Sequence, residues 1–207
     1  MKDCRSEAGN TLMIGVLALQ GNFTRHIELL KRLGISSAEV RYPDQLNDID
    51  GLVLPGGESS VISDLIVRND LLEPIVEFSR VKPILATCAG IILMSKKQMI
   101  QELFHLTFFD IEINRNAYGR QIHSFVDTIQ VDLNGTTSNV VASFIRAPKI
   151  AKLGNDIEVL ATHNGTPVAI RKDRHIGLTF HPELNNETIF HSFLFQMKKK
   201  VDTLSAN

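Results

Sequence analysis

The segment Lys82–Met94, KPILATCAGIILM, combines a predicted strand, a sharp turn and a predicted helix. The apolar run after Pro83 is typical of a buried parallel strand, and the run beyond the turn has the length of a helix. Cys88 stands at the tip, with the small residues Ala86 and Gly90 two positions away on either side. Such a turn strains the backbone, and the start of a helix favours a thiolate. The segment predicts a nucleophilic cysteine, although a lone cysteine in an apolar run is more often a small buried hydrophobe.

A nucleophilic cysteine needs a base, and the base needs an orienting group. His181 follows an expected strand over residues 176–180, and Glu183 stands just beyond Pro182. Positions two apart in extended backbone face the same side, so Glu183 is expected to accept one N–H of His181 while the other ring nitrogen faces the thiol. The alternative is a histidine that bonds only to solvent. The other six histidines, none of them followed by a proline and a carboxylate, are His26, His105, His123, His163, His175 and His191.

A third segment, Pro55-Gly56-Gly57-Glu58-Ser59, joins an apolar strand to a predicted helix. Two glycines permit a turn with positive φ that exposes backbone N–H groups. We expect the N–H of Gly57 to form one half of an oxyanion hole and the N–H of Ala89 to form the other half. The alternative is an ordinary strand-to-helix loop that is capped by Ser59 or Ser60.

The composition indicates a single globular domain. The 207 residues are 43% hydrophobic and 22% charged, and a net charge of −1 offers no basic surface for nucleic acid. The two cysteines, Cys4 and Cys88, form no disulfide pattern, which favours a reducing, cytoplasmic location. No Cys or His spacing predicts a metal site, no apolar run is long enough to span a membrane, and the charged start of the chain is not typical of a signal peptide.

Hydrophobic patterning predicts an α/β domain over residues 12–200, with a flexible segment at 1–11 and a tail at 201–207. Strands and helices alternate in the first half, which indicates a parallel sheet. The expected strands are 12–19, 40–42, 51–54 and 83–87, and the expected helices are 23–33, 60–68, 71–79 and 89–97. Residues 107–145 alternate between apolar and polar, as in antiparallel strands. Later elements are expected as strands near 157–162, 167–171 and 175–180 and a helix over 186–200.

Taken in order, Pro-Gly-Gly-Glu-Ser, Thr-Cys-Ala-Gly and His-Pro-Glu resemble the motifs of class I glutamine amidotransferases. The segments Gly15–Phe23, Arg115–Gln121 and Phe144–Pro148 resemble one family of that class, the glutaminase subunits of pyridoxal 5′-phosphate synthase. The resemblance runs from Met13 to Phe195. It implies a flavodoxin-like α/β domain with a mixed, mainly parallel central sheet, flanking helices and a smaller antiparallel portion.

The same resemblance implies residue roles. Cys88 is the nucleophile, His181 the base and then the acid, and Glu183 the orienting partner. Gln20 matches a glutamine beneath the oxyanion turn, near the partner-facing surface. The positions that match the family's substrate contacts are Gly57, Glu58, Ser59, Arg115, Ile145 and Arg146. The departures from the family pattern are Ala86 in place of Gly, Ser60-Val61 in place of Thr-Thr, and Arg25 where Glu is common.

The implied activity is hydrolysis of L-glutamine to glutamate and ammonia through a Cys88 thioester, without a cofactor. The resemblance implies that the ammonia passes to a synthase subunit that builds pyridoxal 5′-phosphate. That synthase is not expected in this chain, which has no phosphate-binding Gly-x-Gly-x-x-Gly or Gly-Lys-Ser/Thr loop. Three alternatives stay open from the residues alone: the glutaminase of another amidotransferase such as imidazole glycerol phosphate synthase, a binding module with a vestigial triad, and a cysteine peptidase.

Overall fold

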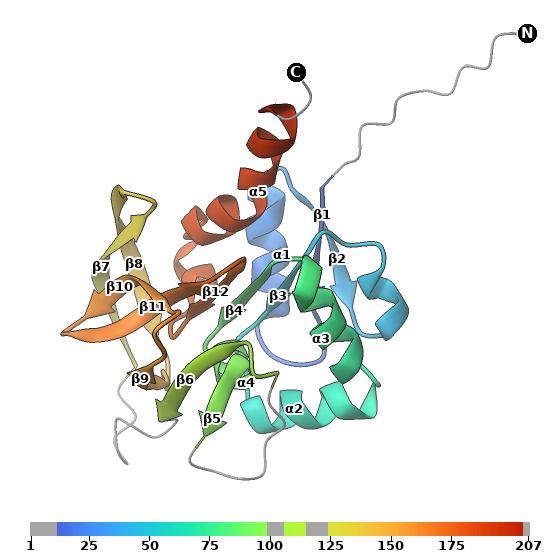
Figure 1. Ribbon diagram of the computed structural model, residues 1–207, viewed down its shortest axis with the longest axis horizontal. Helices are drawn as coiled ribbons and strands as arrows, with labels where there is room; N and C mark the ends of the chain where they lie inside the picture. The colour runs from blue at the N-terminus through green and yellow to red at the C-terminus, as the bar shows by residue number, and fades with distance from the viewer. Residues whose placement is uncertain (1–11, 99–105, 115–123, 205–207) are drawn as a thin grey trace, which may run out of the picture.

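A computed structural model describes residues 12–98, 106–114 and 124–204. Its main feature is a nine-stranded sheet in the order β2-β1-β3-β4-β12-β11-β10-β7-β8, beside a three-stranded sheet in the order β5-β6-β9 (Figure 1). The strands of the large sheet are β1 (Met13–Leu17), β2 (Ser36–Val40), β3 (Gly51–Leu54), β4 (Ile84–Thr87), β7 (Phe125–Leu133), β8 (Thr136–Phe144), β10 (Glu158–His163), β11 (Thr166–Lys172) and β12 (His175–Leu178). Those of the small sheet are β5 (Ser95–Gln98), β6 (Phe109–Asn114) and β9 (Lys149–Leu153).

One half of the large sheet is parallel and the other is antiparallel. Strands β2, β1, β3, β4 and β12 run in the same direction. Strands β11, β10, β7 and β8 continue the sheet as antiparallel neighbours. The expected α/β domain, with a mainly parallel sheet and a smaller antiparallel portion, is therefore confirmed.

Helices cover both faces of the parallel half (Figure 1). Because side chains alternate along a strand, Val53 and Leu85 join the core beneath α1 and α5, while Leu54 and Ala86 join the core beneath α2, α3 and α4. The helices are α1 (Phe23–Arg32), α2 (Ser59–Arg68), α3 (Leu72–Val81), α4 (Ala89–Met94) and α5 (Ile189–Leu204), with short 3₁₀ turns η1 (Pro43–Leu46) and η2 (Pro182–Asn185). In the parts of the chain that the structure describes, no helix is long and apolar enough to cross a membrane.

Several predicted boundaries were wrong. The strand expected at 40–42 is β2, which ends at Val40, and the last helix begins at Ile189 and runs to Leu204. The helix expected over 89–97 ends at Met94, because Ser95 adopts extended backbone and its hydroxyl donates to the Ile92 carbonyl at 2.7 Å. The Ser95 backbone N–H donates to the same carbonyl, so two hydrogen bonds from Ser95 close the last turn of the helix. The chain then forms β5, which was not predicted; β9 was not predicted either.

Candidate active site

Three candidate segments meet at one edge of the sheet. The parallel strands β3, β4 and β12 are neighbours, and their carboxyl ends lead into Pro55, Cys88 and His181 respectively. The carboxyl edge is where an open α/β sheet places its site. The structure therefore brings together the three segments that were expected to supply the thiol, its base and the oxyanion donors.

Cys88 occupies a strained turn between β4 and α4. Its φ of 48° and ψ of −101° lie in a region that residues with a Cβ seldom adopt. The backbone N–H of Cys88 donates to the Leu178 carbonyl at 2.9 Å, which ties the turn to β12. A Cβ at Gly90 would come within 2.3 Å of the Leu54 carbonyl oxygen, so the first turn of α4 needs glycine to approach β3. The small residues around Cys88 are thus explained by close packing.

His181 links the thiol to Glu183. Its Nδ1 lies 2.6 Å from Glu183 Oε1, and both side chains are buried. Burial disfavours the charged imidazole, but hydrogen bonds to Cys88 and Glu183 outweigh this and raise the pKa of His181 to about 10. Because an ionised carboxylate only accepts, Nδ1 carries the proton that faces Glu183, and Nε2 is left for the sulfur. The arrangement can hold a thiolate beside an imidazolium.

The backbone around Glu183 differs from the predicted one. Strand β12 ends at Leu178, and Pro182 opens the 3₁₀ turn η2 instead of continuing an extended segment. The His181 N–H donates to the Ser143 carbonyl at 2.9 Å, so β8 holds this turn in place. The predicted contact between the two side chains is present, but the extended backbone predicted between them is a 3₁₀ turn.

The Pro-Gly-Gly turn also differs in detail. Neither Gly56 nor Gly57 has a positive φ. Both positions need glycine because a larger residue would clash. A Cβ at Gly56 would come within 2.3 Å of His181 Cε1, and a Cβ at Gly57 would come within 2.3 Å of Gln20 Oε1. The Gly56 carbonyl accepts the N–H of Asn22 at 3.1 Å, which fixes the orientation of the peptide between the two glycines.

The start of α2 lies beside this turn. Glu58 is the N-cap residue of α2 and makes no side-chain capping bond, so capping by Ser59 or Ser60, the alternative interpretation, is not observed. Ser59 is buried, and the Glu58 N–H donates to Gln20 Oε1 at 2.9 Å. Gln20 therefore lies directly against the turn, as predicted. Whether the N–H groups of Gly57 and Ala89 bind an oxyanion stays a prediction.

The remaining predicted substrate contacts are only partly described. The Ile145 carbonyl is 3.8 Å from the sulfur of Cys88, so this segment borders the thiol. Arg146 is exposed and has a φ of 46°, which is strained for a residue with a Cβ. Arg115 lies outside the described residues. Among the residues described, no group of three or more His, Cys, Asp or Glu side chains could hold a metal ion.

Two further histidines extend the site into the core, and the sequence argument did not select them. His26 from α1 and His191 from α5 are fully buried, and His26 Nε2 lies 3.5 Å from Glu183 Oε2. A signal was present in the sequence, because His26 shares the buried helical face of Leu29 and Leu30 at spacings of three and four residues.

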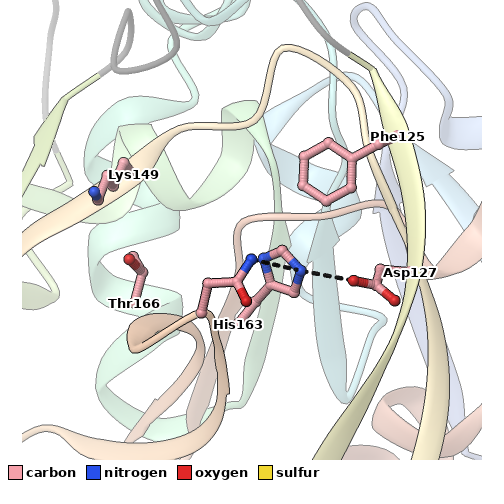
Figure 2. A pocket seen from close by; sticks show the side chains of 6 residues that line it. Phe125, Asp127, Lys149, His163 and Thr166 are labelled. Carbon is pink, nitrogen blue, oxygen red and sulfur yellow. Dashed lines mark hydrogen bonds and ion pairs between the residues drawn. The ribbon is translucent and has the colours of Figure 1, made fainter.

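A second His–carboxylate pair lies in the antiparallel half. His163 Nε2 is 2.9 Å from Asp127 Oδ2, and this hydrogen bond lowers the pKa of Asp127 (Figure 2). The Asp127 side chain is 55% exposed, so solvent screens the pair. Cys88, the free cysteine in the described part of the chain, lies beside His181 instead, because a Cβ at Gly56 would contact both of these side chains. The pocket around the second pair is lined by Phe125, Asp127, Lys149, His163, Asn164 and Thr166.

The fold and the site together define a class of protein. The site has a thiol on a strained strand-to-helix turn and a buried His–Glu pair at the carboxyl edge of a parallel sheet. This arrangement is typical of a thiol-dependent acyl-transfer enzyme. The family comes from comparison with known proteins. The family model described as the SNO glutamine amidotransferase family matches residues 16–200, so this chain belongs to that family.

Individual relatives agree with this assignment. Pyridoxal 5′-phosphate synthase subunit PdxT of Shouchella clausii is 41% identical over 197 residues, which cover 95% of this chain and 100% of that protein. The subunit of the same name from Oenococcus oeni is 42% identical, over 92% of this chain and 98% of its own length. A crystal structure of a glutamine amidotransferase superposes with a TM-score of 0.83 at 35% identity and covers 88% of this chain and 97% of the other.

Proposed function

We propose that this protein is the glutaminase subunit of a pyridoxal 5′-phosphate synthase, which hydrolyses L-glutamine to L-glutamate and ammonia. The observation that carries the proposal is the position of Cys88, on a strained turn beside His181, whose ring is hydrogen-bonded to the buried Glu183. Membership of the SNO glutamine amidotransferase family and the PdxT relatives support the choice of substrate and of pathway. The reducing cytoplasm is the compartment that suits a free nucleophilic thiol.

The reaction follows from the protonation states of the site. The Cys88 thiolate attacks the side-chain amide carbon of glutamine, and the N–H groups of Gly57 and Ala89 bind the oxyanion. The His181 imidazolium gives its proton to the amide nitrogen, the C–N bond breaks, and ammonia leaves a thioester on Cys88. Neutral His181 then takes a proton from water, the hydroxide attacks the thioester, and glutamate departs with the thiolate restored.

Substrate recognition completes the proposal. The α-carboxylate of glutamine suits a guanidinium, which binds a carboxylate through two parallel hydrogen bonds. We assign this role to the Arg115 and Arg146 segments. The remaining contacts with glutamine come from Gly57, Glu58, Ser59 and Ile145.

The closing step involves a partner. Ammonia passes to a separate synthase subunit, and we expect glutamine hydrolysis to be slow until that subunit binds. The test measures glutamate release with and without the synthase subunit of a PdxT relative, using glutamine labelled with ¹⁵N at the side-chain amide. We expect faster release with the partner and ¹⁵N in the ring of pyridoxal 5′-phosphate. Equal turnover in both conditions would contradict the dependence on the partner, and no glutamate in either would contradict the glutaminase itself.

Gln20 offers a narrower prediction. Its Oε1 accepts the N–H of Glu58, so this side chain holds the glycine turn that is proposed to bind the oxyanion. Gln20→Met removes the acceptor, and we expect kcat to fall about 10-fold through a displaced oxyanion turn. Gln20→Glu keeps an acceptor oxygen at nearly the same place and is expected to lose much less. Steady-state glutaminase kinetics of the two variants measure the difference. An equal loss of kcat in both would show that the hydrogen bond from Glu58 to Gln20 does not hold the turn in its active position.

A further inference from the structure

A connected set of buried polar side chains continues the site beyond Glu183. Glu183 uses Oε1 for His181, while its Oε2 is buried and has no hydrogen-bond partner at normal distance. The group that faces Oε2 is His26 Nε2, at 3.5 Å, and the same nitrogen lies 3.4 Å from the Thr87 hydroxyl. On its other side, His26 Nδ1 is 2.9 Å from His191 Nε2. These side chains therefore connect α1, α5 and η2 on the side of Glu183 that faces away from His181.

Burial fixes the charge of the two histidines. Both side chains are completely buried, and desolvation lowers the pKa of each, so both are neutral at pH 7. A neutral imidazole has one donor nitrogen and one acceptor nitrogen. Apart from each other, the titratable groups that act on this pair are Glu183, which raises the pKa of His26, and His181, which lowers it.

Only one pair of tautomers suits these contacts. If His26 carries its proton on Nε2, this N–H faces the Glu183 carboxylate, and Nδ1 accepts the Nε2–H of His191. The opposite tautomers would turn the lone pair of His26 Nε2 toward a buried carboxylate oxygen, leave it only the Thr87 hydroxyl as a donor, and bury an unpartnered N–H at His191 Nδ1. In the favoured arrangement, His191 Nδ1 carries no proton, so the atom without a partner is an acceptor and not a buried N–H donor.

We infer that His26 and His191 are positioning residues of the glutaminase: they form a directed pair of imidazoles that holds the Glu183 carboxylate and, through it, the ring of His181. This inference rests on the proposed function. The N–H of His26 favours the ionised carboxylate in a buried place, and its contact with Oε2 leaves Oε1 aimed at His181 Nδ1. Packing alone does not account for the pair, because His191 Nδ1 is buried without a hydrogen-bond partner, which an apolar side chain at this position would avoid.

The tautomers can be measured without any assay of activity. In protein labelled with ¹⁵N-histidine, NMR at pH 7 is expected to show His26 and His191 both neutral and both protonated on Nε2. Assignment comes from the His26→Gln and His191→Gln variants, each of which removes one ring. Protonation of His26 on Nδ1, or a charged His26, would overturn the inference.

Two substitutions at His26 separate positioning from packing. The amide nitrogen of His26→Gln falls near the former Nε2 and restores an N–H toward Glu183, whereas that of His26→Asn falls near Nδ1 and does not. With the synthase subunit present, we expect kcat of the Asn variant to fall about 10- to 100-fold with KM unchanged, since a displaced base slows chemistry but not binding. The Gln variant is expected to stay within about 3-fold of wild type.

The acid side of the pH profile gives a second readout. Burial raises the pKa of Glu183, but the hydrogen bond with His181 and the charge of His181 outweigh this and lower it overall. An N–H of neutral His26 that faces the carboxylate acts in the same direction, because it favours the ionised form. Activity needs ionised Glu183, so it is present above that pKa and lost as pH falls through it. Without the His26 N–H the pKa rises, and the acid limb of kcat is expected to move to higher pH in His26→Asn but not in His26→Gln.

His175 supplies the matched control. It is also buried, its Nδ1 accepts the Ile84 N–H at 3.2 Å, and it starts β12, whose opposite end leads to His181. His175→Asn should lower stability without moving the acid limb. If wild type is active and His26→Asn changes kcat and pH dependence no more than His175→Asn does, the inference fails while the proposed function stands. An inactive wild type contradicts the proposed function, and the NMR tautomers still decide the arrangement of His26.

Discussion

Glutamine hydrolysis is expected to fall by about 10⁴- to 10⁶-fold when Cys88 is replaced by alanine, the range seen when single members of a catalytic triad are removed. The physical reason is that the variant keeps the turn and the oxyanion donors but has no atom that can form the thioester. The His181 pKa should fall as well, because its hydrogen bond to Cys88 is one of the interactions that raise it to about 10. Glutamate release with the synthase subunit present measures the loss.

The control for this prediction is the other cysteine of the chain. Cys4→Ala removes a thiol from the N-terminal segment and is expected to leave glutaminase activity unchanged. A diazoketone analogue of glutamine should label wild type and Cys4→Ala once each and should not label Cys88→Ala. Comparable activity in Cys88→Ala and wild type would contradict the assignment of Cys88 as the nucleophile.

The sequence predicted the parts of the site that local structure determines. A short apolar run, small residues around Cys88 and a second apolar run are sufficient to indicate strand, turn and helix, and the elbow has that form. The partnership of His181 and Glu183 was also predicted, because Pro182 keeps them close whether the backbone is extended or in a 3₁₀ turn. The predicted contact is therefore present although the backbone conformation expected to produce it is not.

The sequence could not give what depends on distant segments. His26 and His191 are 165 positions apart and meet only because α1 and α5 pack on the same face of the sheet. The role of Gly56 was likewise hidden: its flexibility was expected to matter, whereas the folded chain needs the absence of its Cβ beside His181. Strand β5 was missed because the apolar run before it suggested a longer helix than Ser95 allows.

Gly56→Ala is expected to lower kcat by about 100- to 1,000-fold, although the new side chain is one methyl group. An ideal Cβ at this position lies 2.3 Å from Cε1 and 3.0 Å from Nδ1 of His181, and 3.2 Å from the Cβ of Cys88. The imidazole ring cannot turn aside freely, because Nδ1 is held 2.6 Å from Glu183 Oε1 in a buried site. The methyl group must therefore displace the glycine turn or separate the base from the thiol. Both changes act on the reacting groups. We therefore expect a large loss of kcat even where most of the protein stays folded.

Gly15→Ala is the control for Gly56→Ala. It tests whether overpacking alone lowers kcat, or whether the extra methyl group must lie beside His181 and Cys88. A Cβ at Gly15 would lie 2.4 Å from Ile49 Cδ1 and 2.7 Å from Val40 Cγ2, a clash of similar size against apolar side chains. Both variants are expected to lose about 1–3 kcal/mol of stability in urea unfolding, the usual cost of overpacking. Only Gly56→Ala should also lose kcat, because only its methyl group faces His181 and Cys88. Equal kcat in the two variants would mean that Gly56 does not keep the space in which the base meets the thiol.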